Sequence, residues 1–273
     1  MPYSRPTTTY HDELALASEA ARRAGRLQME RYERLERIVH KSEHDVVTEV
    51  DEMSEELIIS LLRGQYPADA FLAEESGRSH VAAPAAESAS GEQRLWVIDP
   101  LDGTVNYANG IPIFCVSIGL VVGGRPVVGV VYDPARDELF SAQAGRGARL
   151  DGAAIHHPAK ARLSDLVLSL ALPRRGWSQR EWRVRKGIRV ARVMGSAALA
   201  LAYVANGRFD GFVQSGGLSL WDICAAGLIA LEGGARVTTL GGDGWFDLAM
   251  SDKSIGLLAA APVHHRTLLE MLA

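Results

Sequence analysis

At residues 96–104 the chain contains Trp96-Val97-Ile98-Asp99-Pro100-Leu101-Asp102-Gly103-Thr104. A short apolar run, typical of a buried strand, ends there in two aspartates, a proline, a glycine and a threonine. The proline restricts one backbone angle, and the glycine allows the backbone to approach a ligand closely. Two acids three residues apart at a strand end repel each other unless a cation lies between them. Because Mg²⁺ prefers carboxylate, carbonyl and water oxygens and often shares its shell with phosphate, we predict a metal site that faces a phosphate.

A plain turn is the alternative interpretation, since Asp-Pro and Asp-Gly are common in turns. Further acids in similar settings favour the metal site. Phe71-Leu72-Ala73 is a second short apolar run, and it ends in Glu74-Glu75-Ser76-Gly77. Downstream, Leu220-Trp221-Asp222 begins an apolar stretch with helical spacing. Asp222 therefore either stabilises a helix start through the helix dipole or belongs to the site.

A fourth acidic segment lies upstream, between Lys41 and Asp51. Apolar residues at helical spacing follow it and predict an amphipathic helix, which Gly64 and Pro67 close. Asp51 lies in the first turn of this helix and away from its apolar side. It is either a simple helix-start acid or a fourth acidic member of the site.

Together the four segments resemble the signatures of the inositol monophosphatase family of Mg²⁺-dependent, lithium-sensitive phosphatases. Those signatures are an early K…D-x-V-T-x-x-D, an E-E-S, the block W-V-I-D-P-L-D-G-T and a W-D-x-x-A-A, and all four occur here in that order. The resemblance covers most of the chain. It implies a mixed α/β (α+β) fold, a layered α-β-α-β-α sandwich of the sugar-phosphatase type, and a homodimer. Residues 1–150 would form a half with most of the metal ligands, and residues 151–273 a half with the last metal aspartate and a substrate-contacting segment.

The resemblance also implies a role for each matching residue. The ligands of two to three Mg²⁺ ions are matched by Glu74, Asp99, the backbone carbonyl of Leu101, Asp102 and Asp222. The catalytic residues are matched by Asp51 and Thr104, which help to orient and activate the attacking water, and by Glu74. Lys41 matches a lysine of the active-site region whose role is less settled.

The expected substrate contacts come from three further segments. Gly103 and Thr104 match backbone amides that hold the phosphate at a helix start. Gly195-Ser196-Ala197 matches a segment that contacts the alcohol part of the substrate, to which Asp222 also contributes. In inositol-specific members a glutamate seven residues before the last metal aspartate binds substrate hydroxyls. Here that position is Ser215, which can bond a hydroxyl but lacks the charge and reach of a carboxylate, so inositol specificity stays open.

The expected chemistry follows from charge. A phosphate monoester is a dianion, so an anionic nucleophile is repelled unless cations neutralise the phosphoryl oxygens. Two ions about 3.5–4 Å apart can make hydroxide from water and stabilise the leaving alkoxide, and no covalent enzyme intermediate is required. A rival chemistry uses a nucleophilic aspartate in a D-x-D-x-T pattern. Asp99 and Asp102 are one residue too far apart for that pattern.

The composition is that of a globular enzyme. A chain of 273 residues can form a large core as one domain or two closely packed halves. No apolar run reaches the roughly 18 residues of a membrane span, and residues 1–10 lack the apolar centre of a signal peptide. We therefore expect a cytoplasmic protein without membrane contact. The formal charge of −4 argues against nucleic acid as a partner of the whole chain. Cys115 and Cys224 are expected as buried, reduced thiols.

Periodicity predicts the order of the elements. A first amphipathic helix is expected over about residues 14–27, and the segment 79–93, rich in Ala, Ser, Pro and Glu, is expected as an insertion. The remaining expected elements are strands at 113–122, 126–132 and 139–142, followed by a half that alternates strand and helix: a strand at 167–171, a helix at 197–205, a strand at 209–213, the Asp222 helix and a strand at 235–239.

One basic stretch is not explained by the four motifs. Residues 174–192 contain eight basic residues, one acid and two tryptophans. The segment is either a solvated surface, a subsite for a second anionic group of the substrate, or a docking patch for RNA or protein. Two function classes remain. The first is a phosphatase for inositol monophosphate, histidinol phosphate, fructose 1,6-bisphosphate or adenosine 3′,5′-bisphosphate; the second is a non-catalytic RNA- or protein-binding protein.

Overall fold

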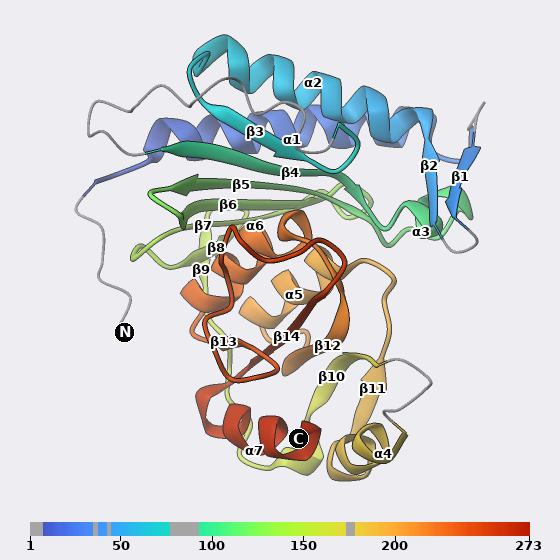
Figure 1. Cartoon of the computed structure of the whole chain (residues 1–273), viewed down its shortest axis with the longest axis vertical. Coiled ribbons are helices and arrows are strands. Elements are labelled where there is room, and N and C mark those ends of the chain that lie inside the picture. The colour runs from blue at the N-terminus through green and yellow to red at the C-terminus, as the bar shows by residue number, and fades with distance from the viewer. Residues whose placement is uncertain (1–7, 35–37, 43–44, 77–92, 173–177) are drawn as a thin grey trace.

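Two β-sheets and the helices around them form five alternating layers (Figure 1). The structure is a computed structural model, and it describes residues 8–34, 38–42, 45–76, 93–172 and 178–273. The helices in these ranges are α1 (His11–Arg31), α2 (Glu49–Gln65), α3 (Thr104–Ala108), α4 (Ser178–Gly187), α5 (Ala197–Ala205), α6 (Leu220–Glu232) and α7 (Pro262–Leu272).

The strands belong to three sheets. A two-stranded hairpin contains β1 (Ile38–Ser42) and β2 (Asp45–Thr48). The seven-stranded sheet runs in chain order through β3 (Ala70–Ala73), β4 (Arg94–Asp102), β5 (Cys115–Val122), β6 (Arg125–Asp133), β7 (Glu138–Gln143), β8 (Ala148–Leu150) and β9 (Ala153–Ile155). The five-stranded sheet has the order β11 (Val190–Arg192), β10 (Val167–Ala171), β12 (Gly211–Leu218), β14 (Ile255–Ala260) and β13 (Arg236–Thr239).

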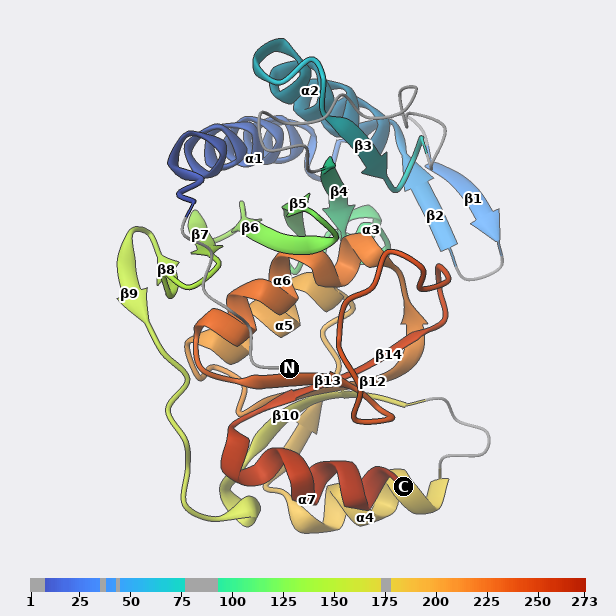
Figure 2. The same ribbon diagram turned by 60° about the vertical axis from the view of Figure 1, so that its left-hand side comes forward.

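The layers follow from which faces of these sheets are apolar. Helices α1 and α2 cover the outer face of the seven-stranded sheet, and α5 and α6 lie between the two sheets (Figure 2). Helices α4 and α7 pack together on the far side of the five-stranded sheet (Figure 2). Helices α5 and α6 are apolar all round because both of their sides are buried. This arrangement is the α-β-α-β-α sandwich that the family resemblance implies.

The predicted strand ends lie within two residues of the observed ones, except that the strand predicted at 209–213 is observed as β12, Gly211–Leu218. The turn at Gly123-Gly124 joins β5 to β6, and both glycines have positive φ, as a tight hairpin requires. The helix over residues 197–205 and the strand over 167–171 have the expected bounds. The expected insertion at 79–93 lies, apart from Gln93, outside the described residues. Within the described ranges, no helix combines the length and apolarity needed to cross a bilayer.

A bulge in β4 decides where its two aspartates point. Asp99 lies opposite Ser117 on β5, and Asp102 lies opposite Cys115. Three residues on β4 therefore face two on β5, and the extra residue lies in Pro100-Leu101. In a regular strand, residues three apart point to opposite faces. Because of the bulge, the side chains of Asp99 and Asp102 point to the same face of the sheet. The bulge includes Pro100, whose nitrogen has no hydrogen to donate to the neighbouring strand.

A pair of glycines lets α6 approach the same face of this sheet. Gly119 and Gly129 lie directly opposite each other on β5 and β6. A Cβ on Gly119 would lie 2.5 Å from Sγ of Cys224, and a Cβ on Gly129 would lie 2.6 Å from the carbonyl oxygen of Ala225. Helix α6 therefore packs on bare backbone at this point. Because Asp222 lies two residues before Cys224, the same contact sets how close Asp222 comes to β4.

Candidate active site

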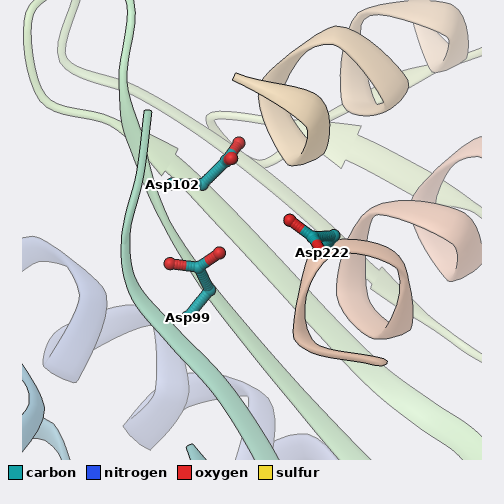
Figure 3. Close-up of side chains that lie close together, drawn as sticks. All are labelled: Asp99, Asp102 and Asp222. Atoms are coloured by element: carbon teal, nitrogen blue, oxygen red, sulfur yellow. The ribbon is translucent and has the colours of Figure 1, made fainter. Parts of the chain in front are cut away.

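Three carboxylates meet between β4 and the start of α6. Oxygens of Asp99, Asp102 and Asp222 all lie within 4.8 Å of one another. Figure 3 shows Asp99 and Asp102 on β4 facing Asp222 across the gap to α6. Asp99 is 1% exposed and Asp102 is 7% exposed, and Asp222 is partly buried. The fold thus brings Asp222 next to Asp99, although 123 positions separate them in the sequence.

This arrangement is electrostatically costly for the metal-free protein. Burial and the charges of Glu74, Asp102 and Asp222 raise the pKa of Asp99 well above its usual value. Burial and the neighbouring Asp102 also raise the pKa of Asp222, to about 8. Burial raises the pKa of Asp102 although several hydrogen bonds to its carboxylate act in the opposite direction. A divalent cation would remove this repulsion.

The donor set fits a hard cation such as Mg²⁺. Every side-chain donor is a carboxylate oxygen, and Mg²⁺ prefers oxygen ligands. Glu74, in the turn after β3, is close enough for a hydrogen bond that also raises the pKa of Asp99. It is therefore a fourth carboxylate beside the cluster. Histidine and thiolate ligands, which zinc favours, are absent from this group of described residues.

Asp51 and Thr104 form a hydrogen-bonded pair, although they lie on different elements. The hydroxyl of Thr104 lies 2.8 Å from Oδ1 of Asp51 and 3.0 Å from the backbone oxygen of Leu101, so its one proton is shared between two acceptors. Oδ2 of Asp51 accepts hydrogen bonds from the backbone N–H and the hydroxyl of Thr48, at 2.9 and 2.6 Å. Asp51 is 1% exposed, so its carboxylate is held rigidly at the start of α2.

Asp102 also fixes the start of α5. Its Oδ2 accepts hydrogen bonds from the hydroxyl of Ser196 at 2.5 Å and from the N–H of Ala198 at 2.8 Å, and its Oδ1 accepts from the N–H of Ala197 at 3.1 Å. Backbone amides in the first turn of a helix have no partner within the helix. Asp102 supplies their acceptor from another element. The Gly195-Ser196-Ala197 segment is thereby held beside the three carboxylates.

Gly103 joins this arrangement to the start of α3. Its φ is +98°, and a Cβ there would lie 2.9 Å from the carbonyl oxygen of Ile113 and 3.2 Å from Cβ of Ser196. Glycine is therefore required for both conformation and space. Asn106 on α3 donates to the carbonyl oxygens of Ile113 and Met194, both at 2.8 Å, and so ties α3 to the segment that precedes Gly195.

Two further residues expected at the site, Ser215 and Lys41, lie on strands β12 and β1. Ser215 is in the irregular part of β12 and lines a cavity of about 390 Å³ with Gly256 and Leu240, among others. Lys41 lies in β1, where side chains are outside the described part of the chain.

The basic stretch forms, over its described part, the surface helix α4 and the strand β11. Arg174, Arg175 and Trp177 lie outside the described residues. Arg185 pairs with Glu181 at 2.7 Å, and Arg189 pairs with Asp165 at 2.9 Å.

Some residues that hold the site together belong to no catalytic or metal-binding motif. Glu55, Asn106 and Ser219 are examples, because none of them carries expected chemistry. The sequence spacing nevertheless indicates two of the hydrogen-bonded contacts at the site. Thr48-x-x-Asp51 and Ser219-x-x-Asp222 are capping boxes, and both form in the structure. The spacing thus indicates two helix starts that share their acidic residue with the site.

Comparisons with known proteins show the family of the chain. The model of the inositol monophosphatase family matches residues 10–273, and the chain belongs to this family. Nus factor SuhB of Pasteurella multocida is 40% identical over 237 residues, which cover 84% of this chain and 85% of the relative. Inositol monophosphatase 2 of Solanum lycopersicum is 38% identical over 232 residues, which cover 81% and 85%. The IMPase structure from Thermotoga maritima has a TM-score of 0.83 at 30% identity and covers 96% of both chains.

Proposed function

We propose that this chain is a Mg²⁺-dependent phosphomonoesterase that hydrolyses a small phosphorylated alcohol with an activated water and without a covalent intermediate. The observation that carries the proposal is the group of Asp99, Asp102 and Asp222, whose oxygens lie within 4.8 Å of one another. Membership of a phosphatase family and the similarity to the tomato inositol monophosphatase support the reaction class.

Each residue then has a defined task. Asp99, Asp102, Asp222 and Glu74 would hold Mg²⁺, which when bound would neutralise the phosphoryl oxygens and lower the pKa of water. Thr104 orients the attacking water through its hydroxyl, and Asp51, 2.8 Å away, accepts the proton. The amides of Gly103 and Thr104 bind the phosphate, and the segment Gly195-Ser196-Ala197 contacts the alcohol.

The substrate is decided by groups around this centre. Ser215 lies in the irregular part of β12 and lacks the negative charge that would bind several hydroxyls of inositol. The candidate substrates are therefore inositol monophosphate, histidinol phosphate, fructose 1,6-bisphosphate and adenosine 3′,5′-bisphosphate, and their shared feature is a phosphomonoester on a small alcohol.

Phosphate release from these four compounds tests the proposal. Each is assayed with Mg²⁺, with a chelator in place of Mg²⁺, and with Mg²⁺ plus Li⁺. The expected result is Mg²⁺-dependent release that Li⁺ inhibits and that Asp99→Asn abolishes. Release that persists in the chelator, or equal activity of Asp99→Asn, would contradict the proposed metal site.

A second candidate is a binding role for α4. Trp182 on this helix is 60% exposed, and the Lys186 ammonium lies 4.7 Å from the centre of its ring. Several relatives carry the name Nus factor SuhB. The partner would be RNA or a protein, bound independently of the metal site. RNA binding with a steep salt dependence that is unchanged in Asp99→Asn would support this candidate, and loss of binding in Trp182→Ala would assign it to α4.

A further inference from the structure

Glu55 makes two hydrogen bonds that the proposed chemistry does not use. It lies on α2 four residues after Asp51, so both side chains are on the same face of the helix. Oε2 of Glu55 accepts from the backbone N–H of Glu75 at 2.8 Å, and Oε1 accepts from the N–H of Ser76 at 2.9 Å. Glu55 is only 4% exposed. A carboxylate buried this deeply is costly unless donors surround it, and these two bonds are of the stronger, charge-assisted kind.

The two bonds hold the turn that begins with Glu74. On its other side, the N–H of Glu74 donates to the carbonyl oxygen of Ile98 at 3.2 Å, and Ile98 directly precedes Asp99. The backbone around Glu74 is therefore tied to β4 before the residue and to α2 after it. The carboxylate of Glu74 lies within hydrogen-bond distance of Asp99.

We propose that Glu55 is a positioning residue of the metal site, which holds the carboxylate of Glu74 at the distance from Asp99 that a cation needs. The inference rests on the proposed function. Without Glu55, two consecutive, partly buried amides lose their acceptor, and the turn moves to find others. Residues that support metal ligands typically change metal affinity roughly 10–100-fold when they are replaced. Because Glu55 acts through the backbone, we expect the lower end, about tenfold.

Glu55→Gln is the test variant, and Glu56→Gln is its matched control. Glutamine has nearly the same shape, but its amide group places a donor against one of the two backbone N–H groups. Glu56 is the next residue on α2 and is exposed. Glu55 and Glu56 both line a cavity of about 670 Å³ beside Glu75. Its replacement removes an equal charge from the same surface. Glu55→Asp is a second variant, which keeps both acceptor oxygens on a shorter side chain.

Three measurements are made on the full-length variants: Mg²⁺ binding by calorimetry, the Mg²⁺ concentration that gives half-maximal phosphate release, and thermal unfolding in chelator. In Glu55→Gln we expect the dissociation constant for Mg²⁺ and the half-maximal Mg²⁺ concentration both to rise about tenfold. The kcat at saturating Mg²⁺ should stay within about threefold of the wild-type value. Glu56→Gln should match the wild type, and Glu55→Asp should lose less affinity than Glu55→Gln.

The outcomes separate this inference from the proposed function. A Glu55→Gln protein with wild-type Mg²⁺ affinity but a lower unfolding temperature would show a purely structural role and overturn the inference. If Glu55→Gln does not fold, wild-type affinity in Glu55→Asp together with a displaced unfolding temperature would overturn it equally. Wild-type protein that binds Mg²⁺ without phosphate release would refute the phosphatase proposal, and the calorimetric comparison would still decide the role of Glu55. Absence of Mg²⁺ binding to the wild type would refute both.

Discussion

Gly119→Ala tests whether the close contact between α6 and the seven-stranded sheet positions Asp222. The new Cβ would lie 2.5 Å from Sγ of Cys224 and 3.2 Å from its Cβ, so α6 must move or the sheet must yield. Overpacking of a buried contact costs about 1–3 kcal/mol. We expect Gly119→Ala to lower the free energy of unfolding by about 2 kcal/mol.

Removing the sulfur should compensate for this change. In Cys224→Ala the nearest atoms to the new Cβ become those at 3.2 and 3.3 Å, which require a shift of only a few tenths of an ångström. Cys224→Ala alone should cost about 1 kcal/mol, because a buried side chain loses volume. The double variant should then be more stable than the sum of the two single changes predicts, by about 1 kcal/mol or more.

Urea unfolding in chelator measures these free energies, and Gly129→Ala is the control. Its Cβ would collide with backbone atoms of Ala225, at 2.6 and 3.0 Å, so Cys224→Ala offers it no relief. Mg²⁺ affinity should fall in Gly119→Ala and recover in the double variant, because Asp222 moves with α6. Additive costs for Gly119→Ala and Cys224→Ala, within about 0.5 kcal/mol, would refute the reasoning, as would equal rescue of Gly129→Ala.

Asp99→Asn should abolish turnover and leave the metal-free protein as stable as the wild type or more so, because one repelling charge disappears; near-normal phosphate release would contradict its role as a ligand. Asp102→Asn should also abolish turnover but lower the free energy of unfolding in urea by about 1–2 kcal/mol, since an amide N–H₂ replaces one of the two oxygens that accept from the first turn of α5; unchanged stability would count against that role. Thr104→Ala should lower kcat more than it raises KM for the preferred phosphomonoester, and an unchanged kcat would exclude its hydroxyl from orienting the water. The raised pKa of Asp222, about 8, means that the folded metal-free protein binds more protons than the unfolded chain between about pH 4 and pH 8. Urea unfolding in chelator should therefore show a free energy of unfolding that falls as pH rises from about 5 to about 9. Added Mg²⁺ should reverse this fall. A free energy of unfolding that rises over this range would contradict the raised pKa of Asp222.

Much of the fold follows from local patterns in the sequence. The bounds of α5 and β10 and the turn at Gly123-Gly124 were predictable because apolar periodicity and turn residues agree there. The layered order came from the family resemblance instead. Periodicity alone does not say that α5 and α6 lie between two sheets, although their apolar character on every side is consistent with it.

The site was predictable in composition more than in geometry. The acidic residues were identified from their positions at strand ends and helix starts, but strand alternation alone would place Asp99 and Asp102 on opposite faces. The bulge at Pro100-Leu101 reverses that result, and only the pairing with β5 reveals it. Glu55 was not identified because its function depends on backbone amides of a turn distant in sequence, for which no side-chain pattern exists.

Anomalous diffraction from crystals grown with Mn²⁺ and phosphate tests the central claim most directly, because Mn²⁺ accepts the same oxygen ligands as Mg²⁺. We expect anomalous peaks about 2.0–2.2 Å from oxygens of Asp99, Asp102 and Asp222, with the phosphate between them and the start of α3. The same crystals of Asp99→Asn should lose at least one of these peaks. Mn²⁺ bound elsewhere on the chain, with no peak among the three carboxylates, would contradict the account.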